Sequence, residues 1–449
     1  MNNSSERIVA TRIPEPKLQF YNGTHISPRK ILDLKPFSYK KLLDEEIHIK
    51  ILTDTETEYL CKKLVNHLIN GYSTLNASFP SFREVFGGKL LFEENSDIKI
   101  SSSKNLLVDL EESLDALRSS RSRGIVIVGL KALSMDNYIR AKIKVMEGYS
   151  SLNIRSQFIK KETIEKHVRS GSYAYLLMNM ATAIYAKAGG IPWKLSRSIL
   201  STNGLILGIS FSRKRIPSGK EVIYYGAIEL FDKYGEHLFT QIKMFTAHPE
   251  QLKTKGLFVP YEILKPILTN AIKQYGKPPQ IIIHKSSPFA DEEIKAIEEV
   301  TTAHNALYIF AHIKSNTVYR AYDPLASDFS IQRGLMLLRL FRSSRWPQYI
   351  IFTTGKLYRS AEERGKLGTP RPLEVTIDIN TDVSTNVFTW SNYIGHQILA
   401  LTKLDWNTTD PEIREPITIK YSRKAAQIAP EILNQDSRDY IVRDIRDLM

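Results

Sequence analysis

The sequence predicts an α/β protein that combines two different arrangements of strands and helices. Its 449 residues can form two or three domains with cores of their own, and 42% apolar with 24% charged residues is typical of a folded protein. In the first part of the chain, strand-like and helix-like patterns alternate. In the second part, three strand-like segments follow one another before the alternation returns. These two orders of strands and helices predict two domains of different topology.

The first part has the pattern of a small doubly wound domain. IHIKILTD (47–54) alternates like a strand, and GIVIVGL (124–130) is an unbroken apolar run typical of a buried parallel strand. Helical periodicity follows each of them, last in DNYIRAKIKVMEGY (136–149). Residues 1–37 are polar with scattered prolines, so we expect a lead-in with few strands there. A Rossmann-like domain is expected over residues 38–165.

The second part has the element order of the ribonuclease H fold. Three strands joined by hairpins come first, and then helix, strand, helix and strand alternate. The segments are LILGISFS, EVIYYGAIELFD, HLFTQIKMF, YEILKPILTNAIKQY, QIIIHKS, DEEIKAIEEVTTAHN and LYIFAHIKS. The order βββαβαβ predicts a ribonuclease H-like domain, which we assign to residues 166–449.

The strand ends of this second domain do not carry the acids that its chemistry needs. Phosphodiester cleavage on this fold uses two divalent cations that carboxylates hold at the ends of the first and fourth strands. Here the first strand ends in Gly208 to Ser212 and the fourth in His284 to Ser287, without Asp or Glu. A serine hydroxyl is neutral and binds magnesium only weakly. The sequence therefore predicts a domain that cannot hold the two cations.

Composition restricts the partners and excludes several kinds of site. A net charge of +14 and a pI near 9.4 favour a polyanionic partner, either nucleic acid or an anionic membrane surface. No signal-peptide segment and no apolar run long enough to span a bilayer is present, so a cytoplasmic protein without a transmembrane segment is expected. The single cysteine, Cys61, agrees with a reducing compartment and is expected to be a packed thiol. No spacing fits zinc or a phosphate-binding loop.

Three separated segments, in this order, resemble the prokaryotic Argonaute proteins. They are SGSYAYLLMNMATAIYAKAGGIPWKL (170–195), GKLGTPRPLEVTID (365–378) and LTKLDWNTTDPEIREPITIKYS (401–422). The resemblance covers roughly residues 40–449 and is to the short, archaeal-type members that consist of a MID and a PIWI domain. It implies that residues 38–165 are the MID domain, which binds the 5′ end of a guide strand, and that residues 166–449 are the PIWI domain.

The resemblance also implies that the PIWI domain is inactive. The catalytic set of the family is Asp, Glu, Asp and a fourth Asp or His. By position, the first Asp falls on Ser210, the second on Ser286 and the last residue on or near Arg423. Asp232 and Asp291 are alternative metal ligands, but both lie outside the aligned strand ends and are expected to serve a turn and a helix N-cap. We therefore expect no enzymatic activity from this chain.

Matching the guide-end motif of the family residue by residue selects Tyr138, Lys142, Gln157 and Lys187. Tyr138 and Lys142 are four residues apart and share one face of a helix. The tyrosine can stack on the first base, the lysines supply charge, and Gln157 can donate to phosphate or bind a metal. The resemblance adds the C-terminal carboxylate of Met449, which with Gln157 would hold Mg²⁺ or another divalent cation against the guide phosphates.

Basic residues are concentrated around this motif and after the first strand of the second domain. Residues 138–194 contain ten Lys or Arg against three Glu, which favours phosphate contacts beside the pocket. Arg213, Lys214 and Arg215 follow the first strand and are expected to contact a nucleic-acid duplex.

Together these features predict a guide-dependent recognition protein. It would hold a short guide, RNA favoured over DNA, by its 5′ phosphate and bind a complementary strand, DNA favoured, through base pairing. The resemblance implies a separately encoded effector or accessory protein that gives the output in defence against viruses or plasmids. Two alternatives stay open: an active guide-directed endonuclease with a non-standard metal site, and a dimeric DNA-organising protein that needs no guide.

Overall fold

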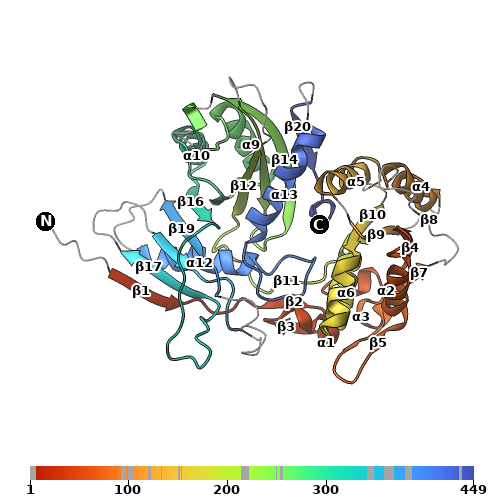
Figure 1. Ribbon diagram of the computed structural model, residues 1–449. Coiled ribbons are helices and arrows are strands. Elements are labelled where there is room, and N and C mark those ends of the chain that lie inside the picture. The colour runs from red at the N-terminus through yellow and green to blue at the C-terminus, as the bar shows by residue number, and fades with distance from the viewer. Residues whose placement is uncertain are drawn as a thin grey trace. The chain divides into compact units, whose positions relative to one another are not determined.

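Contacts along the chain divide the computed structural model into two units (Figure 1). Unit 1 comprises residues 1–17, 195–404 and 411–445, and unit 2 comprises residues 18–194, 405–410 and 446–449. The structure describes residues 7–92, 98–99, 106–119, 123–132, 134–149, 152, 154–213, 222–248, 250–252, 256–340, 348–357, 369–379, 387–433 and 437–449.

Unit 2 is built on a parallel sheet with the strand order β10-β9-β4-β7. The strands are β4 (Glu46–Thr53), β7 (Lys89–Phe92), β9 (Arg123–Leu130) and β10 (Ile154–Lys160), and β8 (Ile98–Lys99) extends the pairing along β4. The connecting helices are α2 (Glu58–Asn70), α4 (Leu106–Ser119) and α5 (Met135–Gly148). The predicted alternation of parallel strands and helices is therefore confirmed.

The apolar run in β9 is explained by helices on both faces of its sheet. Val126 and Val128 pack with α4 and α5 in one core. On the other face, a Cβ at Gly129 would collide with the Sγ atom of Cys61 in α2. Cys61 is a fully buried thiol, as predicted.

Short elements and two further helices complete unit 2. They are β2 (Leu18–Phe20), β3 (Gly23–His25), α1 (Ile31–Leu34), β5 (Tyr72–Ser73), β6 (Ser78–Phe79), α3 (Phe82–Phe86), α6 (Lys161–Arg169), α7 (Tyr173–Lys187) and β11 (Lys194–Leu195), the last at the division between the units. Helix α7 is apolar on nearly all sides because most of its side chains are buried. It was predicted to open the second domain, yet contacts assign it to unit 2.

Unit 1 contains a ten-stranded mixed sheet with the order β1-β17-β18-β19-β16-β15-β12-β13-β14-β20. Its central elements are β12 (Leu205–Arg213), β13 (Val222–Phe231), β14 (His237–Ala247), α9 (Tyr261–Gln274), β15 (Gln280–Lys285), α10 (Asp291–Ala303) and β16 (Leu307–Lys314). The first three strands are antiparallel, and β12, β15 and β16 are parallel. The predicted βββαβαβ order and the α/β class are confirmed.

The outer part of this sheet and two long helices follow later in the chain. They are β17 (Leu335–Leu340), β18 (Gln348–Ile351), β19 (Leu373–Ile379), α12 (Val387–Leu401), α13 (Ile417–Ile432) and β20 (Asp439–Val442). Helix α13 lies against β12, β13 and β14, as Figure 1 shows.

The two faces of β12 pack against different helices because side chains alternate along a strand. Leu205, Leu207 and Ile209 belong to a core that includes residues of α9 and α10. Gly208, Ser210 and Ser212 lie on the other face and meet, respectively, Thr418, Ser422 and Ala426 of α13. These α13 residues are spaced by four and therefore share one helix face. The serines of β12 are thus docking residues for a helix.

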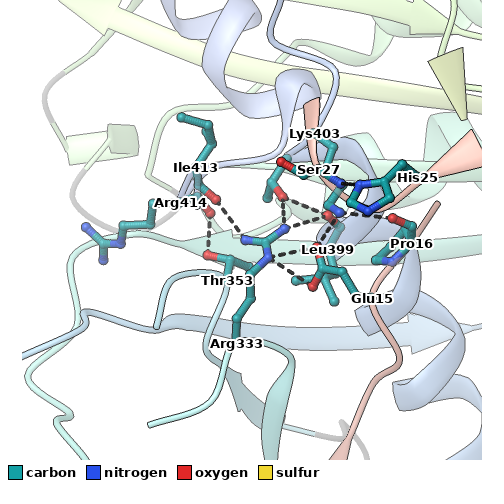
Figure 2. Close-up of polar contacts among 11 residues, drawn as sticks. Glu15, Pro16, His25, Ser27, Arg333, Thr353, Leu399, Lys403, Ile413 and Arg414 are labelled. Atoms are coloured by element: carbon teal, nitrogen blue, oxygen red, sulfur yellow. Dashed lines mark hydrogen bonds and ion pairs between the residues drawn. The ribbon is translucent and has the colours of Figure 1, made fainter. Parts of the chain in front are cut away.

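The expectation of few strands before residue 37 is wrong. Strand β1 (Arg7–Arg12) pairs antiparallel with β17 at one edge of the ten-stranded sheet. Figure 2 shows how the following segment is held: the Glu15 carboxylate accepts from Arg333 Nε at 3.1 Å and from Lys403 Nζ at 2.5 Å. Sequence alone does not indicate β1 because its partner strand lies more than 300 residues later in the chain.

Across the described part of the chain, no helix is both long enough and apolar enough to cross a membrane.

Candidate nucleic-acid interface

A cavity of about 700 Å³ lies in unit 2 between β10 and three helices. Tyr138 of α5, Gln157 of β10, His167 of α6 and Asn179 of α7 contribute polar groups to its wall. Lys160, Thr163 and Asn407 add further polar groups, and apolar side chains line most of the rest, among them Met135, Phe158, Leu176 and Met180. The cavity therefore combines a polar end with an apolar wall, as sites for small organic groups do.

The position of the cavity follows from the topology of the parallel sheet. Ligands of such sheets bind beyond the carboxyl ends of the strands, where the next helices begin. Helix α5 follows β9 and starts at Ser134, whose Oγ accepts from the main-chain nitrogen of Asn137 at 3.2 Å. Ser134 and Met135 line the cavity, so the start of α5 faces it. The N–H groups of a first helical turn favour an anion there.

Tyr138 lies on the cavity wall with its ring held by an aromatic neighbour. The rings of Tyr138 and Phe158 meet edge to face, with their centroids 5.0 Å apart. Burial raises the pKa of Tyr138 to about 12, so the hydroxyl group is protonated at neutral pH and can donate a hydrogen bond. The ring is thereby oriented for contacts with a base or a phosphate.

Gln157 and Lys187 contact each other directly. The Lys187 ammonium group donates to Gln157 Oε1 and to the main-chain oxygen of Ser156, each at 2.7 Å. Lys187 is only 2% exposed, although it stands at the end of α7. Buried lysines need partners, and here main-chain and amide oxygens supply them. Gln157 itself lines the cavity, so the ammonium charge lies one hydrogen bond from its wall.

Lys142 and Met449 form a second contact in unit 2. Lys142 Nζ donates to the main-chain oxygens of Met449 at 2.5 Å and of Asp447 at 2.9 Å. All five predicted residues thus belong to unit 2, and four of them form two contacts, Gln157 with Lys187 and Lys142 with Met449. Tyr138 and Gln157 line the cavity, whereas Lys142, Lys187 and Met449 are not part of its lining.

Two residues of this region were missed in the sequence. Arg155 is 4% exposed and donates to the main-chain oxygen of Lys187 at 2.8 Å and to Asp447 Oδ1 at 3.0 Å. It connects the end of α7 with the segment that contacts Lys142. The signal was present, because Arg155 and Gln157 are two apart on one strand and share a face.

The second missed residue is Asn179, a polar residue inside the apolar run of α7. Its Oδ1 atom accepts from both the main-chain nitrogen and Oγ1 of Thr409, each at 2.8 Å. A main-chain N–H can only donate, so this contact fixes which amide atom is the oxygen. Asn179 also lines the cavity, where its Nδ2 group is a candidate donor to a ligand.

The oxygens expected to bind a divalent cation are already hydrogen-bonded. Gln157 Oε1 accepts from Lys187, and the main-chain oxygen of Met449 accepts from Lys142. Within the described ranges, no group of three or more His, Cys, Asp or Glu could hold a metal ion. Each of the two oxygens expected to bind the cation thus already faces an ammonium group, which brings positive charge to the same place.

The positions aligned with the catalytic set lie in unit 1 and make structural contacts. Ser210 is fully buried, 2.8 Å from Ser422 Oγ and 3.4 Å from the main-chain oxygen of Ile419. Ser286 donates its main-chain N–H to the main-chain oxygen of Ile209 at 3.1 Å. Arg423 follows Ser422 in α13 and donates through Nη1 to the two carboxylate oxygens of Glu415, at 2.7 and 2.6 Å.

Two buried titratable residues flank Gly208 in the same row of the sheet. Glu229 pairs with Gly208 on one side and His284 on the other. Burial raises the pKa of Glu229 well above its usual range and lowers the pKa of His284 to about 3, so burial disfavours the charged form of both. A Cβ at Gly208 would collide with the main-chain oxygen of Thr418, so α13 occupies the space above the row.

The two alternative metal ligands have structural roles. Asp232 Oδ1 accepts from the main-chain nitrogens of Tyr234 and Glu236, each at 2.8 Å, which is the predicted turn. Asp291 is not the predicted N-cap, because it is the first residue of α10 and Ala290 precedes it as the cap. The Glu293 carboxylate accepts from the main-chain nitrogen of Ala290 at 2.9 Å and so satisfies the helix start.

The predicted basic run after the first strand is described only in part. Arg213 ends β12 and is exposed. Lys214 and Arg215 lie outside the described residues.

Comparison with known proteins gives a consistent result in sequence and in structure, although no protein-family model matches the chain. The protein argonaute of Aquifex aeolicus (strain VF5) is 21% identical over 411 residues, which are 89% of this chain and 50% of the relative. Clostridium butyricum Argonaute, bound to a guide DNA (5′ deoxycytidine) and a 19-mer target DNA, matches with a TM-score of 0.65 and 20% identity, over 97% of this chain and 54% of that one.

Two further solved structures agree. Aquifex aeolicus Argonaute has a TM-score of 0.63 and 17% identity, over 97% of this chain and 55% of that one. Marinitoga piezophila Argonaute in complex with a 5′ OH guide RNA has a TM-score of 0.60 and 14% identity, over 95% and 58%. The chain spans about half the length of these relatives. In sequence and in structure, this chain is a homologue of the Argonaute proteins.

Proposed function

We propose that this protein holds a short guide strand by its phosphorylated 5′ end in the cavity of unit 2 and pairs the guide with a complementary target strand. The observation that carries the proposal is the buried ammonium group of Lys187, hydrogen-bonded to Gln157 on the wall of the cavity. Solved structures of similar fold that hold a guide and a target strand support the binding of both strands, although one of these guides carries a 5′ OH. We assign unit 2 mainly to a MID domain and unit 1 mainly to a PIWI domain.

In this proposal the polar end of the cavity receives the phosphate. The start of α5 offers main-chain N–H groups, Tyr138 offers a hydroxyl donor, and Gln157 offers an amide donor. Lys187 and Lys142 supply positive charge from behind the wall, where low exposure strengthens electrostatic attraction. Arg155 acts through Lys187 and is a positioning residue, because it holds the end of α7.

The apolar wall then receives the first nucleotide's base. The Tyr138 ring can stack on it, as aromatic rings do in single-strand recognition. Asn179, with its oxygen fixed by Thr409, presents the amide nitrogen to the base or the sugar. The volume of about 700 Å³ is in the range of sites that bury a molecule of this size.

Magnesium remains part of the proposal only as a ligand that competes with the lysines. Gln157 Oε1 and the main-chain oxygen of Met449 are the atoms that would hold it, and each now accepts from an ammonium group. A cation would supply positive charge against the guide phosphates. The two lysines supply that charge without it.

We further propose that the protein recognises targets without cutting them. Serines stand at both strand-end positions where the family has acids, and α13 packs on Ser210 and over Gly208. Output then comes from a separately encoded effector or accessory protein in defence against viruses or plasmids. The resemblance of its sequence motifs leads us to assign the chain to the short MID-PIWI type. From the same resemblance we favour an RNA guide, a DNA target and a cytoplasmic location.

Binding of oligonucleotides that differ only at the 5′ end tests the proposal. Wild-type protein should bind a 5′-phosphorylated oligonucleotide at least tenfold more tightly than its 5′-hydroxyl form, and Lys187→Ala or Lys142→Ala should abolish the difference. Lys131→Ala is the control, because Lys131 is an exposed lysine that pairs with Glu56 outside the cavity. Equal affinity of the wild-type protein for the two oligonucleotides would overturn the proposal and favour binding without a guide.

A further inference from the structure

Arginines of unit 1 are gathered around one carboxylate. Arg423 donates through Nη1 to both oxygens of Glu415, and Ser315 Oγ donates to Glu415 Oε1 at 2.5 Å. Arg414, the residue before Glu415, donates through Nη2 to the main-chain oxygens of Ser315 and of Pro372, the second at 3.0 Å. Three chain segments thus meet here, and each of them carries an arginine.

The other two arginines are Arg371, which precedes Pro372, and Arg320, in the loop that begins at Ser315. Both are exposed. Arg320 is oriented by hydrogen bonds from Nη1 to the main-chain oxygens of Thr317 at 3.1 Å and Tyr319 at 2.6 Å. We call the four residues Arg320, Arg371, Arg414 and Arg423 the arginine cluster.

The charges of the cluster act on one another. Burial lowers the pKa of Arg414, Glu415 raises it, and the positive charges of the other three arginines lower it further. Glu415 sets one negative charge against the four positive charges of the cluster, so positive charge is in excess. Nearby, Lys314 and Glu374 balance each other in an ion pair at 3.3 Å. Like charges held this close are unfavourable unless an anion joins them.

The arginine cluster is not an extension of the buried ion pairs of the same unit. Figure 2 shows the Arg414 side chain pointing away from Arg333, which is paired with Glu15. The main-chain oxygen of Arg414 faces that side and accepts from Thr353 Oγ1 at 2.6 Å. The Arg423 side chain is 35% exposed, so an incoming ligand can reach it.

We propose that the arginine cluster binds the phosphodiester backbone of the nucleic acid that the protein holds. A guanidinium group can match two phosphate oxygens with two parallel hydrogen bonds, and Arg423 now contacts both oxygens of Glu415 through one nitrogen, Nη1. The Glu415 carboxylate keeps Arg423 in position until a phosphate group replaces that carboxylate as the partner of the guanidinium group. The inference rests on the proposed function, since it needs a bound nucleic acid.

The location of the cluster supports this role. Ser422, next to Arg423, is hydrogen-bonded to Ser210 at 2.8 Å. The cluster therefore lies beside the strand that, by resemblance, would carry a catalytic acid. The positive charge that metal ions would bring is here supplied by the protein itself, without the need for carboxylate ligands.

The salt dependence of target binding tests the inference. Guide-loaded protein is titrated with a complementary strand at several salt concentrations, for wild type, Arg423→Ala, Arg371→Ala and the control Arg83→Ala. Arg83 is an exposed arginine of unit 2 that pairs with Asp44. Removing one arginine–phosphate contact with a duplex reduces the slope of log K against log salt by about 0.9, and we expect this for the two cluster variants with a roughly tenfold weaker affinity. The control should keep the wild-type slope.

Two more variants separate guanidinium geometry from charge. Arg423→Lys should keep the slope but bind the target several-fold more weakly, because an ammonium group cannot make the paired contact. Glu415→Gln should bind the target several-fold more tightly at low salt, because the competing anion is removed. If Arg423 variants fail to fold, Arg371→Ala and Arg320→Ala still decide the question, since both side chains are exposed.

Guide binding is measured on the same samples and separates the arginine cluster from the guide pocket. If the cluster variants keep both the preference for 5′-phosphorylated guides and the wild-type slope, the role proposed for the arginine cluster is wrong. The proposed guide pocket would then still stand. A reduced slope already with the guide as a single strand would assign the contact to the guide, and a reduced slope only with the target would assign it to the duplex. Wild-type protein without 5′-phosphate preference would overturn the proposed function instead.

Discussion

Lys187 Nζ lies 2.7 Å from Gln157 Oε1, a hydrogen bond that joins two residues thirty positions apart beside a cavity. A buried ammonium group that reaches the wall of a cavity is a costly arrangement unless an anion is bound there. The first turn of α5 contributes donors to the same place. Substitutions can test both this geometry and the contact between β12 and α13.

Two substitutions at Tyr138 should separate the contribution of its hydroxyl group to guide binding from that of its ring. Tyr138→Phe removes one donor and should weaken binding of a 5′-phosphorylated guide by about 1 kcal/mol, a factor of about five. Tyr138→Ala also removes the stacking surface and should cost a further 1–3 kcal/mol or so. Guide titration measures both. Equal binding by wild type and Tyr138→Ala would show that the ring does not touch the guide.

Restoring an acid at Ser210 should destabilise the protein. The site is fully buried against Ser422 and Ile419, so a carboxylate there is unpaired and should cost roughly 3 kcal/mol or more of unfolding free energy. The double variant Ser210→Asp/Ser286→Asp should not cut a matched target with magnesium or manganese. Thr246→Asp, at an exposed position of β14, is the control and should unfold like wild type. A stable double variant that cleaves would refute the role given to α13.

Gly208 should tolerate no side chain. A Cβ there would collide with the main-chain oxygen of Thr418, so Gly208→Ala should lower the free energy of unfolding by about 1–3 kcal/mol. Gly148→Ala is the matched control, because nothing lies within 4 Å of the added Cβ. Denaturant unfolding measures both. Similar stability of the two variants would mean that α13 does not press on β12 at this point.

Acid should destabilise the protein in part through His284. Burial lowers its pKa to about 3, below its unfolded value of about 6.5, so the unfolded chain binds the proton more readily. The contribution to stability is complete above pH 6.5 and is lost as the pH falls toward 3. His284→Asn should make the slope of unfolding free energy between pH 6 and 4 shallower by up to about 1.4 kcal/mol per pH unit. The exposed His248→Asn should leave the slope unchanged, and an unchanged slope in both would contradict the burial argument.

The sequence predicted the elements whose patterns are strong and local. The segments from β12 to β16 show clear periods separated by turns, and they fold in the predicted order. Strand β1 escaped prediction because it is short and pairs with β17, more than 300 residues later in the chain. The Asp291 cap was assigned wrongly because a side chain three residues into the helix, Glu293, satisfies the helix start.

The candidate site could be predicted only at the positions that match the motif of the family. Tyr138, Gln157 and Lys187 came from a motif, and strand alternation could have added Arg155. The arginine cluster could not be found in this way, because its members lie in three separate segments that only the fold brings together. Composition indicated a positive charge, and the structure locates where part of it is concentrated.

The most direct test of the central claim is a single incubation. The protein, a 5′-phosphorylated guide and an end-labelled target are mixed with magnesium and manganese, and bound and cleaved target are measured on native and denaturing gels. We predict that complementary target is bound intact, and that binding is lost with a 5′-hydroxyl guide or with Lys187→Ala. Binding that is independent of the guide, or target cut at a defined position, would contradict it.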